Sequence, residues 1–166
     1  DLHSNAISGG GTPQSSCGSA GLYIDLAQSP ALPTGPLGII RNNVIQHGSC
    51  PSGYVVKEKS PNGDPRIFEH NALVPPSDQG IPLYFDEDVT ALMTAAAVNA
   101  LTDMTASGNI DTQPGLSYTG SGFPVLSAGS PLRNAGTAAG APAWDHERDA
   151  RPQESAPDIG PDEYVP

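Results

Sequence analysis

The fold is decided by a short motif that occurs first as Ser4-Asn5-Ala6-Ile7 and again as Asn42-Asn43-Val44-Ile45. A small or polar residue precedes an Asn, and two apolar or small residues follow it. The motif returns as His70-Asn71-Ala72-Leu73 and, in a shorter form, as Gly108-Asn109-Ile110, so that successive Asn residues lie 38, 28 and 38 positions apart. Repeats of about 20–50 residues indicate solenoids or related arrays, because each unit buries its apolar face only against its neighbours.

The recurring Asn gives this repeat a physical cause. Stacked side chains of Asn5, Asn43, Asn71 and Asn109 at an inward or corner position can form hydrogen bonds to the units on either side. The alternative is that Asn recurs only because it suits turns. We expect the ladder, and therefore an all-β fold that is a parallel β-helix of about three turns.

A second register between the Asn motifs supports the same architecture. The stretch Cys17–Ile24 resembles the stretch Cys50–Val56, 33 residues later, since each has a Cys, a small-residue turn and a Gly before a short strand. One turn of the coil would contain a strand at 21–26, a Pro-rich loop and a strand at 38–45.

The same register predicts a disulfide between Cys17 and Cys50. If Gly21–Ile24 stacks on Gly53–Val56 at a strand spacing of about 4.8 Å, the two Cα atoms fall within the roughly 4.4–6.8 Å that a disulfide tolerates. An even number of cysteines favours pairing in an exported protein. The alternative is two free thiols in a cytosolic protein.

Composition limits the classes of partner. The 166 residues suit one domain, and 19 Gly with 18 Pro indicate many turns. A formal net charge of −11 repels nucleic acid over most of the surface. No apolar run reaches the roughly 20 residues of a membrane span. The chain starts with Asp1-Leu2-His3-Ser4, which lacks the features of a signal peptide, so we expect a piece of a longer exported precursor.

The apolar spacing changes to three and four between Asp86 and Leu101, which predicts one amphipathic helix near 88–101 packed on the coil. Asp86 would cap this helix, and Glu87 and Asp88 would lie in its first turn. Its apolar face would comprise Val89, Leu92, Met93, Ala96, Ala100 and Leu101. We expect residues 1–113 to form the coil with this helix, and residues 114–166 to form a loop-rich capping tail on the same domain, with a strand candidate at Phe123–Leu126.

The tail contains three segments that carry a resemblance: Ser130-Pro131-Leu132-Arg133-Asn134-Ala135-Gly136, Arg151-Pro152-Gln153 and Asp158-Ile159-Gly160-Pro161-Asp162-Glu163-Tyr164. Their order and spacing resemble the terminal signature of bacterial surface and secreted β-helix proteins of the pectate-lyase-like superfamily, particularly the choice-of-anchor Q proteins. Asn134 stands where that family usually has Asp. The resemblance implies a right-handed parallel β-helix, an extracellular or cell-surface location and an association with carbohydrate.

For polysaccharide lyases on this fold, the resemblance suggests Asp residues that hold calcium and an Arg or Lys that removes a proton. Arg41 and Lys57 are the candidates for positions that face a ligand. A solvated strand face explains both residues equally well, and no convergent acid, base and metal set is visible. We therefore assign no catalytic residue.

Asp145, Glu147 and Asp149 alternate in a short acidic turn of the tail. Carboxylate oxygens of this kind suit calcium, and the sequence indicates no other cofactor. The alternative, which we favour, is that the carboxylates pair with Arg148 and Arg151 and fasten the tail to the coil.

We expect a non-catalytic segment of a secreted or cell-surface β-helix that serves as the C-terminal cap of a larger protein. Its partners would be the preceding turns of the parent chain and a glycan or another surface protein. The alternatives are a fragment of a polysaccharide lyase or glycosidase, and a structural filament or adhesin building block. A cap is needed because an open end exposes unpaired strand edges.

Overall fold

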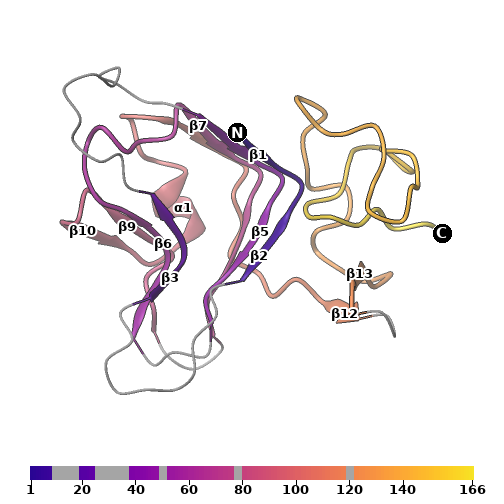
Figure 1. Ribbon diagram of the computed structural model, residues 1–166, viewed down its shortest axis with the longest axis horizontal. Helices are drawn as coiled ribbons and strands as arrows, with labels where there is room; N and C mark the ends of the chain where they lie inside the picture. Colours follow the sequence, from indigo (N-terminus) through magenta and orange to yellow (C-terminus); the bar gives the residue numbers. More distant parts are fainter. Residues whose placement is uncertain (9–18, 25–37, 49–51, 77–79, 119–121) are drawn as a thin grey trace.

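A computed structural model describes residues 1–8, 19–24, 38–48, 52–76, 80–118 and 122–166, and these residues are mostly β. Figure 1 shows three sheets that face one another and a loop-rich tail beside two of them. Sheet A contains β1 (Leu2–His3), β4 (Ile39–Arg41), β7 (Ile67–Glu69) and β11 (Thr105–Ser107). Sheet B contains β2 (Ala6–Ser8), β5 (Val44–Gln46) and β8 (Ala72–Val74). Sheet C contains β3 (Ser19–Ile24), β6 (Gly53–Glu58), β9 (Tyr84–Asp86) and β10 (Thr90–Leu92).

Strand pairing follows chain order within each sheet. The pairs β1–β4–β7–β11 in sheet A and β2–β5–β8 in sheet B are all parallel. In sheet C, β3–β6–β9 are parallel, and β10 then closes the last edge in the antiparallel direction. Parallel strands require a connection of a dozen or more residues, which is why the strands that pair are separated by long stretches of sequence.

The predicted strand at 38–45 is two strands, β4 and β5, with a corner between them. Asn42 adopts a left-handed backbone with φ 54°, and this conformation ends β4 and turns the chain into sheet B. Ser4, His70 and Gly108 have the same conformation at the corresponding corners, with φ of 52°, 51° and 63°. The residue before each ladder Asn therefore sets the corner, and two of the four, Asn42 and Gly108, are of the types that tolerate this region best.

The predicted helix near 88–101 is wrong in extent. The helix α1 covers only Ala95–Val98, and β9 and β10 occupy the segment before it. Glu87 and Asp88 have φ of 51° and 58°, which a right-handed helix cannot contain, and they form the turn of a hairpin instead. Val89, which was expected on the apolar face, is 77% exposed.

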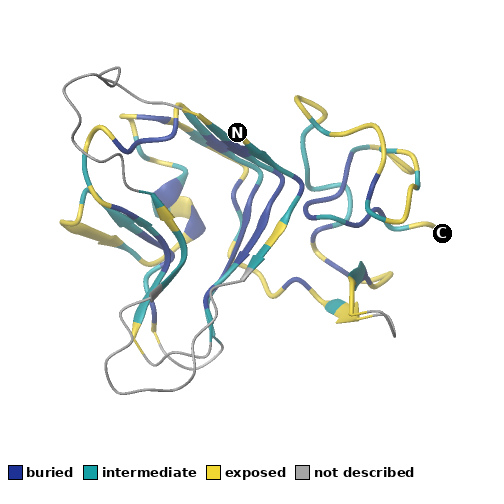
Figure 2. Cartoon of the chain, viewed as in Figure 1, coloured by how far each residue is buried: buried dark blue, intermediate teal, exposed yellow. Residues whose placement is uncertain are grey.

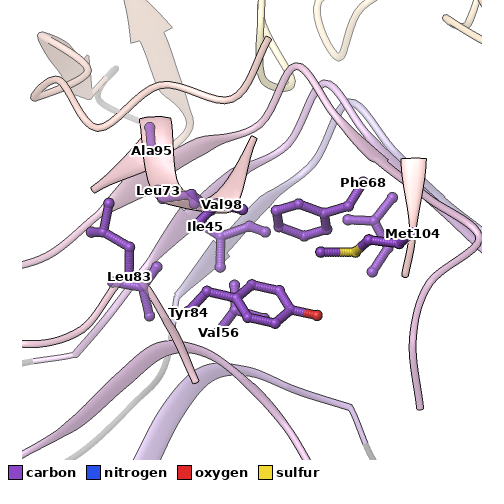
Figure 3. Close-up of a cluster of buried hydrophobic side chains, with 11 residues drawn as sticks. Ile45, Val56, Phe68, Leu73, Leu83, Tyr84, Ala95, Val98 and Met104 are labelled. Carbon is purple, nitrogen blue, oxygen red and sulfur yellow. The ribbon is translucent and has the colours of Figure 1, made fainter. Parts of the chain in front are cut away.

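The main core lies between the three sheets. Each sheet contributes fully buried side chains to it, such as Phe68 from sheet A, Leu73 from sheet B and Val56 from sheet C. Figure 3 shows the ring of Phe68 above that of Tyr84, and the two rings meet edge to face with centroids 5.4 Å apart. The core therefore joins segments that the chain visits at widely separated positions.

The tail packs on the outer face of sheet B. Val44, Ala72 and Val74 face a second buried cluster to which Leu132 and Ile159 of the tail belong. Figure 2 shows buried segments in both the sheet and the tail at this junction. The tail has one small hairpin, made of β12 (Leu116–Tyr118) and β13 (Pro124–Leu126), and the latter overlaps the strand candidate at Phe123–Leu126. Sheet B is thus covered on both faces.

The register of sheet C differs from the expected one. Ser19 pairs with Gly53 and Leu22 with Val56, so that the strands are shifted by two residues from the stacking of Gly21 on Gly53. Cys17 and Cys50 lie outside the described residues, and their bridge stays a prediction.

Candidate functional site

The four predicted ladder residues form one directional column of hydrogen bonds. The backbone N–H and the Nδ2 of Asn5 both donate to Oδ1 of Asn43, at 3.0 and 3.1 Å. Asn43 donates in the same way to Asn71, and Asn71 to Asn109, at 3.0–3.1 Å throughout. Each Oδ1 therefore accepts two hydrogen bonds from the preceding Asn, and the column has a donor direction that runs with the chain.

Asn99 ends the column at the side of β11. Its Oδ1 accepts hydrogen bonds from the N–H and the Nδ2 of Asn109, at 3.1 and 2.8 Å, and its own Nδ2 donates to the Asn109 carbonyl oxygen at 3.0 Å. Asn99 is also the C-cap of α1, and its backbone N–H donates to Ala95. The sequence analysis missed this residue, because it lies outside the motif spacing.

The opposite end of the column is open. Asn5 Oδ1 receives no hydrogen bond from the residues that the structure describes, whereas every later Oδ1 in the column receives two. The strands β1, β2 and β3 are all edge strands at this same end. Among the described residues, the unfilled acceptor and the unpaired edges of β1, β2 and β3 therefore belong to one surface, which we call the open end.

A hollow of about 250 Å³ lies at the open end. Leu2, Leu22, Ile24 and Ile40 contribute apolar side chains to its wall. Leu2, Leu22 and Ile24 are only partly buried, whereas core side chains farther along the sheets, such as Val56, are fully buried. The hollow at the open end thus has a wall of partly exposed apolar side chains.

The two candidate ligand-facing cations lie on different sheets and each has an acidic partner. Arg41 pairs with Glu69 across β4 and β7, with 2.6 Å between Nε and Oε1, and both side chains are 15% exposed. Lys57 on sheet C pairs with Asp88 at 2.6 Å, and its Nζ lies 5.4 Å from the centroid of the Tyr54 ring. The structure does not bring Arg41 and Lys57 together in one site.

The tail is fastened to the corner residues that precede the ladder. Asn42 Nδ2 donates to the Thr137 carbonyl oxygen at 2.7 Å, and the Thr137 N–H returns a hydrogen bond to Asn42 Oδ1 at 2.9 Å. The Gly160 N–H donates to the Asn42 carbonyl oxygen, and His70 Nδ1 lies 2.8 Å from the Ala135 carbonyl oxygen. Two of the corners, at Asn42 and His70, therefore bind the tail at Ala135, Thr137 and Gly160.

The acidic turn of the tail is held by its first residue. Asp145 Oδ1 accepts hydrogen bonds from the N–H groups of Glu147 and Asp149, both at 2.8 Å, and its Oδ2 accepts one from Glu163 at 3.0 Å. The structure groups Asp145 with His146 and Asp162 as possible metal ligands, rather than with Glu147 and Asp149. Oδ1 of Asp145 thus closes the acidic turn, and its Oδ2 links that turn to the chain at Glu163.

Arg151 forms an ion pair with Glu163, and not with Asp145, Glu147 or Asp149, so the pair lies within the tail and does not fasten the acidic turn to the sheets. Its Nη1 lies 3.5 Å from Oε2 of Glu163, and both side chains are 1% exposed. Arg151 also donates to the carbonyl oxygens of Asp158 and Gly160, at 3.2 and 2.8 Å. Burial nevertheless raises the pKa of Glu163 to about 7.

Two further acidic groupings lie near the ends of β6 and β9, and the sequence analysis did not identify them. They share Asp64, and their other members are Glu58, Asp86, Glu87 and Asp103. Glu58 and Asp86 lie 28 positions apart, like the paired residues Val56 and Tyr84 of the same strands. That spacing was the signal in the sequence that could have revealed the cluster.

In the described ranges, no helix has the length and apolar character required to cross a membrane. Comparisons of the chain with protein-family models, with curated proteins and with solved structures found no match.

Proposed function

We propose that this chain is a non-catalytic closing segment of a right-handed parallel β-helix, in a secreted or cell-surface protein whose coil continues beyond β1, β2 and β3. The observation that carries the proposal is the direction of the Asn column, which Asn99 ends at one side and which Asn5 Oδ1 leaves open at the other. A preceding turn with an Asn at the same corner would donate its N–H and its Nδ2 to that oxygen.

The open end supports this proposal in a second way. The edges of β1, β2 and β3 carry backbone groups that a further set of parallel strands could pair. Such a turn would also cover the hollow lined by Leu2, Leu22 and Ile24, and burial of apolar surface is the dominant favourable term in such an association. The other end offers no equivalent position in sheet C, because β10 runs antiparallel there.

The proposed location outside the cell rests on the resemblance of the tail segments and on the predicted disulfide. The lyase alternative has less support, because Arg41 and Lys57 are each ion-paired and lie on separate sheets. A glycan remains a candidate ligand of sheet C, where Tyr23 is 51% exposed and where the rings of Tyr54 and Phe85 on the neighbouring strands stack on each other.

Hydrogen exchange on two forms of the protein tests the closing role. Peptide mapping first establishes the mature chain in its natural source, and amide exchange is then measured on that chain and on residues 1–166. We expect the amides of β1, β2 and β3 to exchange at least about tenfold more slowly in the longer chain, because a preceding turn pairs their edges. The amides of β5 and β6 are the matched control, since both strands already have a neighbour on each side.

Two results would overturn the proposal. One is equal exchange of β1, β2 and β3 in both forms. The other is a natural chain that consists of residues 1–166 alone. Sedimentation would then show whether that chain is a monomer or a dimer formed through the open end.

A further inference from the structure

Five acidic side chains from separate segments meet beside sheet C. Glu58 ends β6, Asp64 lies in the following loop, Asp86 ends β9, Glu87 lies in the β9–β10 turn and Asp103 follows α1. One oxygen from each of Glu58, Asp64 and Asp86 lies within 4.8 Å of the others, and the same holds for Asp64, Glu87 and Asp103. The two groupings share Asp64, so the five carboxyl groups form one cluster, which we call the Asp64 cluster.

The buried part of this cluster is held in place by backbone groups. Glu58 is 0% exposed and Asp64 is 5% exposed. The N–H of Ser60 donates to Glu58 Oε1 at 2.5 Å, and the N–H of Glu87 donates to Glu58 Oε2 at 2.9 Å. Each carboxylate oxygen can accept a second interaction, so both oxygens of Glu58 keep a lone pair for a further partner.

The cluster has no cationic partner of its own. Among the described residues, none of Glu58, Asp64 and Asp86 forms an ion pair with a Lys, Arg or His. Buried charges in proteins are normally paired or coordinate a metal.

Tyr84 supplies an independent observation that points to a ligand at this place. Its side chain is 0% exposed, and its hydroxyl has no hydrogen-bond partner among the described residues. Tyr84 and Asp86 lie two positions apart in β9 and so share one face of the strand. Figure 3 shows the Tyr84 oxygen pointing toward Met104, the residue after Asp103, and the charges of Glu58, Asp64, Asp86 and Asp103 all act on this hydroxyl. A buried phenol normally has a partner, and a bound water or ligand at the cluster would provide one.

We propose that the Asp64 cluster binds one Ca²⁺ ion, with Glu58, Asp64 and Asp86 as direct ligands and with Glu87 and Asp103 on the solvent side. The donors are all oxygens, which suits calcium and not zinc, whose structural sites use nitrogen and sulfur. Calcium–oxygen distances of about 2.3–2.6 Å place opposite ligands about 4.8 Å apart, so each triad fits around one ion. The ion would join the ends of β6 and β9 to the loop after α1.

This site is separate from the calcium candidates of the tail, Asp145, Glu147 and Asp149. It is also independent of the proposed closing function, since it lies in sheet C and involves none of the open strand edges. The tail candidates nevertheless provide a matched control, because Glu147 is an exposed carboxylate in another acidic group.

Calcium titration of the metal-stripped chain tests the proposal. The protein is treated with a chelator and then titrated with CaCl₂ by calorimetry, and thermal unfolding is followed in parallel. We expect one ion per chain with a Kd below about 1 mM, and a higher Tm with calcium because only the folded state binds it. MgCl₂ should bind more weakly, because magnesium demands near-ideal octahedral geometry and gives up its water reluctantly.

Three variants locate the ion. Asp64→Asn should weaken calcium binding at least about tenfold, and it should raise the Tm of the metal-free chain because it removes a buried charge. Asp103→Asn, at the exposed side, should keep the fold and cause a smaller loss of affinity. Glu147→Gln should bind calcium like the unmodified chain. The proposal fails if the unmodified chain shows neither heat nor a Tm change at about 10 mM CaCl₂, or if Glu147→Gln weakens binding as much as Asp64→Asn.

Discussion

Replacement of Asn71 by Ala should be among the most damaging single changes in the chain. Asn71 is 0% exposed, and its side chain takes part in four hydrogen bonds: Nδ2 donates to the Ile40 carbonyl oxygen and to Asn109 Oδ1, and Oδ1 accepts from the N–H and the Nδ2 of Asn43. At about 1 kcal/mol net for each bond, Asn71→Ala should lower the free energy of unfolding by about 4 kcal/mol. Buried groups that are left without partners add to this loss.

Asn5→Ala is the matched control, because the residue type and the corner are the same. Asn5 is only partly buried, and its side chain donates two hydrogen bonds, to the His3 carbonyl oxygen and to Asn43 Oδ1, and accepts none from the described residues. Its loss should therefore cost about 1–2 kcal/mol.

Urea unfolding followed by circular dichroism measures both variants, and an unchanged m value shows that the same surface is exposed on unfolding. A variant that is unfolded without urea has lost at least the whole stability of the parent. The reasoning is refuted if Asn71→Ala costs no more than Asn5→Ala, because the column would then not be a stabilising network whose interior members hold more bonds than its open end.

Three other perturbations have definite expected outcomes. Gly21→Ala should destabilise the chain by about 1–3 kcal/mol, because the new Cβ would lie 2.7 Å from the carbonyl oxygen of Gln46; urea unfolding measures it, and a neutral result would contradict the close approach of the two strands. Burial raises the pKa of Glu163 from 4.5 to about 7, so the folded state holds this proton more tightly than the unfolded state does. The free energy of unfolding should therefore fall by up to about 3 kcal/mol as the pH rises from 4.5 to about 7. Glu163→Gln should flatten this dependence on pH, and a free energy that rises over the same range in the unmodified chain would contradict the reasoning. Non-reducing mass spectrometry should find the chain two hydrogens lighter than its reduced form. Alkylation of Cys17 and Cys50 in the native protein would show free thiols and contradict the predicted disulfide.

The sequence alone located the Asn column, because its members recur with the spacing of the structural repeat. Asn43, Asn71 and Asn109 sit at equivalent corners, and the hydrogen bonds between them need only one residue type at one position per repeat. The same pattern did not reveal that the residue before each Asn is left-handed, as in Asn42 and His70. Many residues of different type can occupy that position, so composition carries no signal for it.

The error in the helix has a clear physical origin. Apolar residues do recur three and four positions apart in the segment 86–101. In the structure, however, Leu92 of β10 is the cross-strand partner of Tyr84 of β9 in a hairpin. The sequence pattern places Glu87 and Asp88 in the first turn of a helix, whereas in the structure they form the turn of that hairpin with left-handed backbone conformations. Periodicity over so few residues cannot decide between a helix and a short edge hairpin, and tertiary pairing with β6 decides it here.

The short helix holds the residue that ends the Asn column, Asn99. The last residue of a directional column must accept two hydrogen bonds. Its own N–H groups must also find acceptors without another Asn beyond it. Asn99 meets this need because its Nδ2 turns back to the Asn109 carbonyl oxygen and its N–H is consumed by α1. The helix is fixed in turn by Thr94 at its N-cap and by Asp111, whose Oδ2 accepts a hydrogen bond from Ala95. A helix of four residues is sufficient for this purpose, since its task is to hold one amide side chain and not to cover a large apolar surface. The same logic explains why the two ends differ: a residue that only donates forward, as Asn5 does, leaves an acceptor that another Asn can use, whereas Asn99 leaves none.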